Sequence, residues 1–265
     1  MIASLPMYDL PVLRGPTDDW WRGLAHHLRA AGLSDVPAEL TRSQASAWLD
    51  DELLLSQTCG YPLTHALAGR VHLVCTPAYA APGCSGAHYS SAIVVGEAPA
   101  GDRLADFRGC VCAYNAADSH SGVNVLRFML APLAGNGPFF ADTVRTGSHA
   151  ASIDAVARGE ADLCAVDAVT HALLAHHQPE ALVGTRVLAY SPQAPGLPLI
   201  TALGTSAAVR TRLRDGIHAA LADPDLESTR SALLLTGAED CSARDYEAIL
   251  DMERDAIARG YGELR

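Results

Sequence analysis

Short apolar runs alternate with helix-like segments along most of the chain, and this alternation restricts the fold more than any other feature. We expect strands at 2–7, 53–56, 71–76, 91–95, 110–115, 163–166, 185–190 and 199–202, and one that ends at Thr146. We expect helices at 18–31, at about 123–133, from about Ser148, after Asp167, and over most of the chain beyond Ser206. Such alternation is typical of α/β proteins with mainly parallel sheets.

The middle of the chain contains a separate group of predicted strands and helices. Residues 97–190 follow a βαβαβ pattern, and the Pro- and Gly-rich stretches EAPAG and SPQAPGLP suit connectors on either side of it. A chain that leaves one α/β lobe, builds a second and then returns crosses twice between them. We therefore predict two lobes, with lobe 1 made of 1–96 plus 191–265 and lobe 2 of 97–190.

Composition and charge exclude several classes of protein. The chain has 265 residues, 49% of them hydrophobic, and a formal net charge of -11. This acidity argues against a nucleic-acid partner, which a basic surface would attract. No apolar run is long enough to span a bilayer, so membrane insertion is not expected.

Two further features concern location and cofactors. The opening MIASLPMYDLP lacks the features of a signal peptide, and the seven cysteines suit reduced, buried thiols. We therefore expect a cytoplasmic protein, or a periplasmic one if an export leader is missing from this chain. The chain carries no P-loop, no Gly-x-Gly-x-x-Gly fingerprint and no complete set of zinc ligands, so we expect neither a cofactor nor a metal.

The stretch NAADSHSGVN, residues 115–124, is the first candidate binding motif. Ser119, His120, Ser121 and Gly122 follow a strand-like run and precede a helix-like run. A helix start offers unpaired N–H groups and the positive end of the helix dipole. Two hydroxyl groups, and a glycine that allows close backbone approach, would make such a start a cradle for an anion. His120 would add a donor or point to solvent.

Two further helix starts in the same predicted lobe resemble this one in composition. TGSH, residues 146–149, offers Ser148 and His149, and Asp167 follows the apolar run LCAV. A carboxylate beside an anion accepts a hydrogen bond from a protonated oxyanion, so Asp167 would select such a ligand or bind an amine. The alternative for all three motifs is helix capping, which favours the same residue types.

These residues resemble a known family. DSHSG after a strand, TGSH with RGEAD downstream, LPMYD and LLLSQTCGYPLT are similar to the PhnD-like phosphate, phosphite and phosphonate substrate-binding proteins. The resemblance covers most of residues 1–200. It implies a two-lobed type 2 periplasmic-binding-protein fold that closes on a small oxyanion between its lobes.

The resemblance also implies roles for individual residues. One lobe would bind the oxyanion through Ser119, Ser121, Ser148 and His149. Asp167 would accept a hydrogen bond from a protonated oxygen of the ligand. Tyr8, Ser56, Gln57 and Tyr61 would contribute from the other lobe. The partners implied are a small oxyanion and an unidentified transporter or regulatory protein.

Two functions remain open from the sequence. The first is non-catalytic binding of a phosphate, phosphite or phosphonate by a cytosolic relative of ABC-transporter substrate-binding proteins. The second is a cytosolic enzyme on the same fold, similar to the chorismate dehydratase of menaquinone biosynthesis, which acts on a small carboxylate. Asp118, His120 or Asp167 would then be the general base. We favour binding, because no nucleophile–base pair is evident in the sequence.

Overall fold

The computed structural model describes residues 1–42, 47–97, 101–135 and 137–265. The chain forms two compact units, each built around its own five-stranded sheet. Unit 1 comprises residues 1–80, 85–87 and 195–245, and unit 2 comprises residues 81–84, 88–194 and 246–265. Among the described helices, none is both long and apolar enough to cross a membrane.

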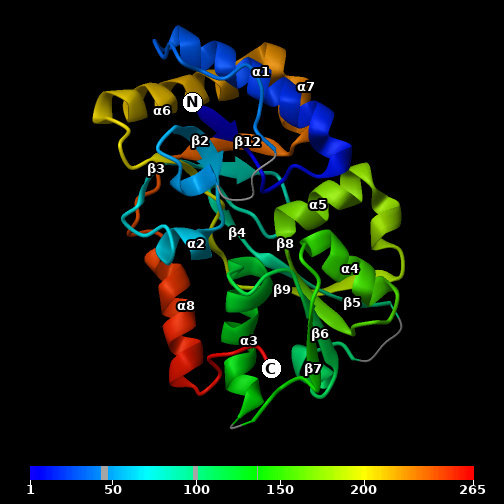
Figure 1. Ribbon diagram of the computed structural model, residues 1–265. Coiled ribbons are helices and arrows are strands. Elements are labelled where there is room, and N and C mark those ends of the chain that lie inside the picture. The colour runs from blue at the N-terminus through cyan, green and yellow to red at the C-terminus, as the bar shows by residue number, and fades with distance from the viewer. Residues whose placement is uncertain (43–46, 98–100, 136) are drawn as a thin grey trace. The chain divides into compact units, whose positions relative to one another are not determined.

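The sheet of unit 1 mixes parallel and antiparallel pairs. Its order is β1 (Ile2–Ser4), β2 (Leu53–Gln57), β11 (Leu199–Ala202), β3 (Val71–Tyr79) and β12 (Leu235–Glu239). β1 pairs with β2 in parallel, whereas β11 runs antiparallel to both β2 and β3, and β12 runs antiparallel to β3. The helices of this unit are α1 (Arg14–Ala30), α2 (Gly60–Thr64), α6 (Ala207–Ala222) and α7 (Glu227–Ala232). Helices α1 and α6 pack side by side (Figure 1).

In unit 2, four of the five strands run in the same direction. The order is β7 (Asp142–Arg145), β6 (Val111–Tyr114), β8 (Leu163–Asp167), β5 (Ser91–Gly96) and β9 (Thr185–Tyr190). β6 pairs in parallel with β7 and β8, and only β5 is reversed, so it runs antiparallel to both β8 and β9. The helices are α3 (Val125–Ala134), α4 (His149–Ala157), α5 (Ala168–His177) and α8 (Glu247–Ala258).

Several short elements complete the two units. The two-residue strands are β4 (His88–Tyr89) and β10 (Ala194–Pro195). Short helical turns lie at Pro11–Leu13, Ala47–Leu49, Leu104–Phe107, His120–Asn124, Pro179–Leu182 and Pro224–Leu226.

The α/β class is as predicted, but the pairing and the unit boundaries differ from the prediction. Both sheets are mixed, because β5, β11 and β12 run against their neighbours. Strand β12 was expected to be helical, and its sequence LTGAE has too few apolar residues to predict a strand. β5 was expected in lobe 1, but it pairs along its length with β8 and β9 of unit 2.

Residues 246–265 were also expected in lobe 1, and they belong to unit 2. Helix α8 packs on α3. Ile249, Met252 and Ala256 are buried on one face of α8, and Tyr261 beyond its end is fully buried. Ala256 and Tyr261 join the same hydrophobic core as Leu126 and Leu130 of α3. The pattern of an amphipathic helix predicts that one face is buried, but it does not show which core that face packs against.

A buried polar network holds α8 against the start of α3. The Asn124 side chain donates hydrogen bonds to the Ile249 carbonyl (3.0 Å) and to Nδ1 of His120 (3.1 Å), and it accepts one from Arg127 (2.8 Å). Arg127 also donates to the Gly262 carbonyl and lies 3.3 Å from Glu253. Burial lowers the pKa of His120 to about 3, and the nearby charge of Arg127 acts in the same direction. His120 is therefore neutral at physiological pH.

The buried His120 is expected to make the protein sensitive to acid. An unfolded chain takes up a proton on this imidazole near pH 6.5, whereas the folded protein takes it up only near pH 3. This contribution to stability is present above about pH 6.5 and is lost as the pH falls towards 3, with a slope of up to about 1.4 kcal/mol per pH unit.

Urea unfolding of wild type and His120→Gln at pH 7, 6 and 5 measures that slope. We expect His120→Gln to be less stable at pH 7, because its packing is altered, but to lose less stability on acidification. Equal pH slopes for the two proteins would contradict the assignment of a neutral His120.

Candidate functional site

Three helices of unit 2 start at one edge of its sheet. Strands β7, β6 and β8 are parallel neighbours, so their carboxyl ends lie at the same edge, where α4, α3 and α5 begin. The carboxyl edge of such a sheet is where ligands bind in open α/β proteins. All the candidate residues predicted for lobe 2 lie at this edge.

The first of these helix starts is a π-helical turn, His120–Asn124, which continues into α3. Ser119 caps it, because its Oγ accepts a hydrogen bond of 3.0 Å from the Gly122 amide. The Asn124 amide bonds back to the Ser119 carbonyl across the wider π spacing. Residues 119–124 are all buried. π-turns of this kind are rare and are often found at functional sites.

Ser121 and His149 bring the first two motifs together. Ser121 Oγ lies 2.9 Å from His149 Nε2, and Ser119 Oγ lies 3.5 Å from Ser121 Oγ. His149 is the first residue of α4, and it reaches Ser121 because β6 and β7 are paired up to Tyr114 and Arg145. Two hydroxyl groups and an imidazole therefore gather between two helix N-termini.

The His149 ring is neutral in this setting. Burial lowers its pKa to about 4, an effect that the nearby backbone of Ala165 opposes. Its Nδ1 is buried and has no hydrogen-bond partner among the described residues. A neutral imidazole has one donor and one acceptor nitrogen, so it can either accept from the Ser121 hydroxyl or donate to it. The site thus presents neutral hydrogen-bonding groups and helix dipoles, without a full positive charge on His149.

Gly122 is required for packing. A Cβ atom added there would lie 2.0 Å from Asn115 Oδ1, which no side chain tolerates without movement of Asn115. Asn115 Oδ1 is buried, and within the described part of the chain it has no hydrogen-bond partner. From the sequence, Gly122 was expected to allow close approach of a ligand, whereas Asn115, the first residue of the same motif, was given no role.

Ser148 and Asp167 both cap helices. Ser148 Oγ accepts from the Ala151 amide at 3.1 Å, and Asp167 Oδ1 accepts from the Val169 and Thr170 amides at 2.8 and 3.1 Å. The capping alternative is therefore realised at both positions, and contact with a ligand stays a prediction. Ser148 is exposed, whereas Asp167 is 2% exposed.

His120 lies away from these groups. Its ring is 2% exposed, bonds to Asn124 and lies 6.2 Å from the Tyr89 ring. The sequence interpretation had given it a donor role or a solvent-facing position, and the structure instead makes it part of the interior network. Adjacent residues at a helix start point in different directions, so Ser121 and His120 face different surroundings.

The four candidates in unit 1 do not form one cluster. Ser56 pairs with Ile200 and Gln57 pairs with Leu199 across β2 and β11, so these neighbouring side chains point to opposite faces of the sheet. Gln57 donates to the Tyr79 hydroxyl (3.2 Å) and to the Leu197 carbonyl (3.1 Å). Tyr61 stacks on the His65 ring, with ring centres 3.8 Å apart.

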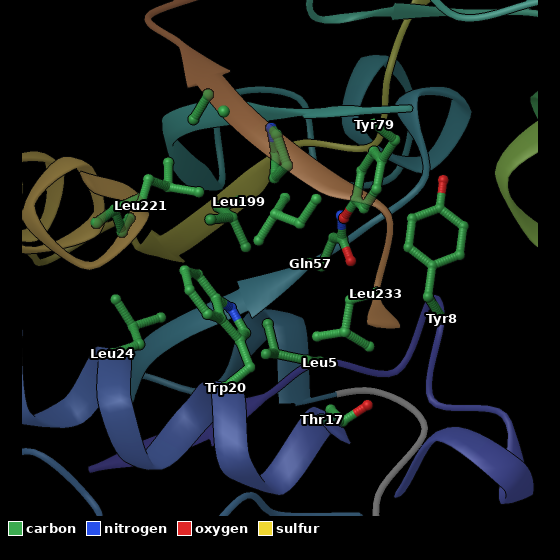
Figure 2. A pocket seen from close by; sticks show the side chains of 15 residues that line it. Leu5, Tyr8, Thr17, Trp20, Leu24, Gln57, Tyr79, Leu199, Leu221 and Leu233 are labelled. Carbon is green, nitrogen blue, oxygen red and sulfur yellow. The ribbon is translucent and has the colours of Figure 1, made fainter. Parts of the chain in front are cut away.

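Tyr8 and Gln57 line a pocket within unit 1 (Figure 2). The Tyr8 ring contacts Tyr79 edge to face, with centres 5.1 Å apart. Trp20, Leu24 and Leu199 form much of the pocket wall. This pocket was not predicted from the sequence, because its walls come from six separate stretches of the chain and consist mainly of ordinary core residues. No group of three or more potential metal ligands occurs within the residues described.

The chain was compared with protein families and with known proteins. A model of the family described as "ABC transporter, phosphonate, periplasmic substrate-binding protein" matches residues 52–246, well over half of the chain. No curated protein matches the chain.

Solved structures show the same fold at low sequence identity. A binding-protein component of an ABC phosphonate transporter from Pseudomonas aeruginosa has a TM-score of 0.77 and 17% identity, over 97% of this chain and 87% of that one. PhnD1 from Prochlorococcus marinus, solved with methylphosphonate, has a TM-score of 0.74 and 13% identity, over 96% and 97%. XAC2383 from Xanthomonas citri, bound to chloride, has a TM-score of 0.70 and 15% identity, over 98% of both chains.

These likenesses identify the α/β architecture as the two-lobed type 2 periplasmic-binding fold. With the family match over residues 52–246, they lead to one conclusion: the chain belongs to the periplasmic substrate-binding protein family of phosphonate ABC transporters.

Proposed function

We propose that this protein binds a phosphonate or a related phosphorus oxyanion at the carboxyl edge of the unit 2 sheet, through Ser119, Ser121 and His149. The observation that carries the proposal is the 2.9 Å contact between Ser121 Oγ and His149 Nε2, which joins two helix N-termini. Helix N-termini supply amide donors and positive dipole ends, and hydroxyl groups add short hydrogen bonds to phosphonate oxygens.

The residues divide into those that would contact the ligand and those that would support them. Ser119 and Ser121 lie on the first helix start, His149 lies on the second, and Asp167 caps the third. Asp167 Oδ1 accepts the two capping bonds, and in this proposal the Asp167 carboxylate also accepts a hydrogen bond from a monoprotonated phosphonate. His120 and Asn115 would hold the turn in place.

An enzymatic role receives no support from the comparisons. The Ser121–His149 pair has the geometry of a nucleophile and a base, but a histidine whose pKa is lowered to about 4 is a weak base at neutral pH. Binding needs only neutral hydrogen-bonding groups and helix dipoles, which the site provides. A cytoplasmic location stays a prediction from the sequence, and cell fractionation tests it.

A thermal-shift titration tests the ligand class. Methylphosphonate, aminoethylphosphonate, phosphite, phosphate, sulfate and small carboxylates would each be added to the purified chain. A ligand at ~100 times its dissociation constant should stabilise the protein by about 2.7 kcal/mol. We expect a shift with at least one phosphorus oxyanion, and we expect Ser121→Ala to weaken it at least tenfold, which corresponds to about 1.4 kcal/mol.

A matched variant controls for stability. Ser206 caps α6 in unit 1, where its Oγ accepts a hydrogen bond from the Val209 amide, so Ser206→Ala removes a capping serine hydroxyl that is not part of the proposed site. It should leave the ligand shift unchanged. Flat melts with every phosphorus oxyanion, or equal weakening by the two variants, would contradict the proposal. A response to carboxylates alone, with turnover, would favour the enzyme.

The affinity should depend on pH through His149. The free ring is neutral because its pKa lies at about 4, and a bound anion would raise that pKa by attraction between opposite charges. Binding then takes up a proton, so affinity should increase as the pH falls from 7 towards 5.

Comparison of wild type with His149→Gln isolates this effect, because the ligand's own titration is the same in both experiments. Calorimetric titrations at pH 7, 6 and 5 should show the ratio of the two affinities growing as the pH falls. A ratio that is constant with pH would place His149 outside contact with the ligand.

A further inference from the structure

The pocket in unit 1 is built for a different kind of ligand. It lies between helices α1 and α6 and the sheet, and its walls are mainly Trp20, Leu24, Leu199, Ile217, Leu221 and Leu233 (Figure 2). It encloses a cavity of about 50 Å³. A single water needs roughly 10–15 Å³ by the same measure, so the cavity is large enough for a small organic molecule.

The chemistry of the lining excludes a charged occupant. None of the 15 residues that line the pocket carries a charged side chain. A bare charge in such surroundings would lose its hydration without gaining a partner. The pocket therefore has no means of binding the oxyanion proposed for unit 2.

One polar group in the lining has an acceptor without a partner within the described part of the chain. Gln57 uses its amide N–H groups to donate to the Tyr79 hydroxyl and to the Leu197 carbonyl, and no described group donates to its Oε1. The Leu197 carbonyl fixes the orientation of this amide, because a carbonyl can only accept.

A buried acceptor without a donor is costly, and proteins seldom keep one without a use. A ligand with its own hydroxyl group could donate to Gln57 Oε1. The apolar walls would bury the rest of that ligand, with the gain that burial of apolar surface provides.

We propose that this pocket is a second ligand site, which takes a small uncharged molecule with a ring-sized apolar body and one hydroxyl group. Phenol represents this class, and toluene is its counterpart of nearly the same shape without the hydroxyl. The site lies wholly in unit 1 and works independently of the anion site.

One glycine allows the pocket to be filled without strain. Gly237 of β12 lines the pocket, its φ is not positive, and a Cβ added to it meets no atom within 4 Å. Gly237→Val therefore adds side-chain volume at the pocket wall. Valine is also a residue type that strands favour. Gly204 is a matched control, because it also has open space around an added Cβ, lies in unit 1, is exposed and is not part of the lining.

The experiment measures binding of phenol and of toluene to the full chain by calorimetry, with melting temperature as a second readout. We expect wild type to bind both compounds, with phenol bound more tightly. Gly237→Val should weaken both by at least tenfold, and Gly204→Val should change neither.

Gln57→Met tests the polar part of the site. Methionine is close to glutamine in length but has no carbonyl oxygen. We expect this variant to bind phenol about tenfold more weakly and toluene as well as wild type does, since tenfold corresponds to the loss of one hydrogen bond. If Gln57→Met leaves the preference for phenol unchanged, the part of the proposal that concerns the ligand's hydroxyl group is wrong.

Other outcomes bear on the site as a whole. Failure of wild type to bind either compound would overturn the proposal, and so would binding that survives Gly237→Val. If Gly237→Val fails to fold, the Gln57→Met comparison still decides the matter. Ser121→Ala should leave phenol binding unchanged, and a loss of phenol binding in that variant would show that the two sites are not independent.

Discussion

The parallel pairing of β6 with both β7 and β8 determines what unit 2 can do. Parallel neighbours end at the same edge, so one sheet edge receives three helix starts, each with a polar residue at its cap. A shift of one residue in any of these pairs would turn every side chain of that strand to the other face. The contact between Ser121 and His149 therefore depends on backbone register several residues away.

This arrangement suits a protein that is acidic overall. With a formal net charge of -11, the chain repels anions at a distance, so an anion site must act through groups within contact range. Oriented amides and hydroxyl groups act in this way, and they lose little strength from the distant charges. A lysine or arginine at the site would bind more kinds of anion, whereas fixed neutral donors discriminate by geometry and by the protonation of the ligand.

Local patterns predicted the helix starts well, and long-range packing was harder to predict. The motifs DSHSG and TGSH, and Asp167 after LCAV, follow strands and cap helices, because capping preferences act within a few residues. The inward turn of His120 depends on Asn124 and on α8, which lies more than one hundred residues further along the chain. No local pattern contains that information. The same holds for the place of residues 246–265 and for the pocket walls of unit 1.

Polar groups in the interior are of two kinds. His120, Asn124, Arg127 and Glu253 are connected by hydrogen bonds and an ion pair. Thr17 Oγ1 and Asn115 Oδ1, in contrast, have no hydrogen-bond partner among the described residues. A sequence shows that polar residues occur at all these places, but only the packed structure separates the connected groups from those without a partner.

The C-terminal segment has a consequence for synthesis of the chain. Unit 1 ends at residue 245, whereas unit 2 needs residues 246–265 to bury Ala256 and Tyr261 in its core and to give the Phe139 amide its bond to the Arg265 carbonyl. A ribosome therefore releases all of unit 1 before it delivers the last part of unit 2. Unit 2, although its strands emerge earlier, is completed last, and until then the face of α3 that packs on α8 is uncovered.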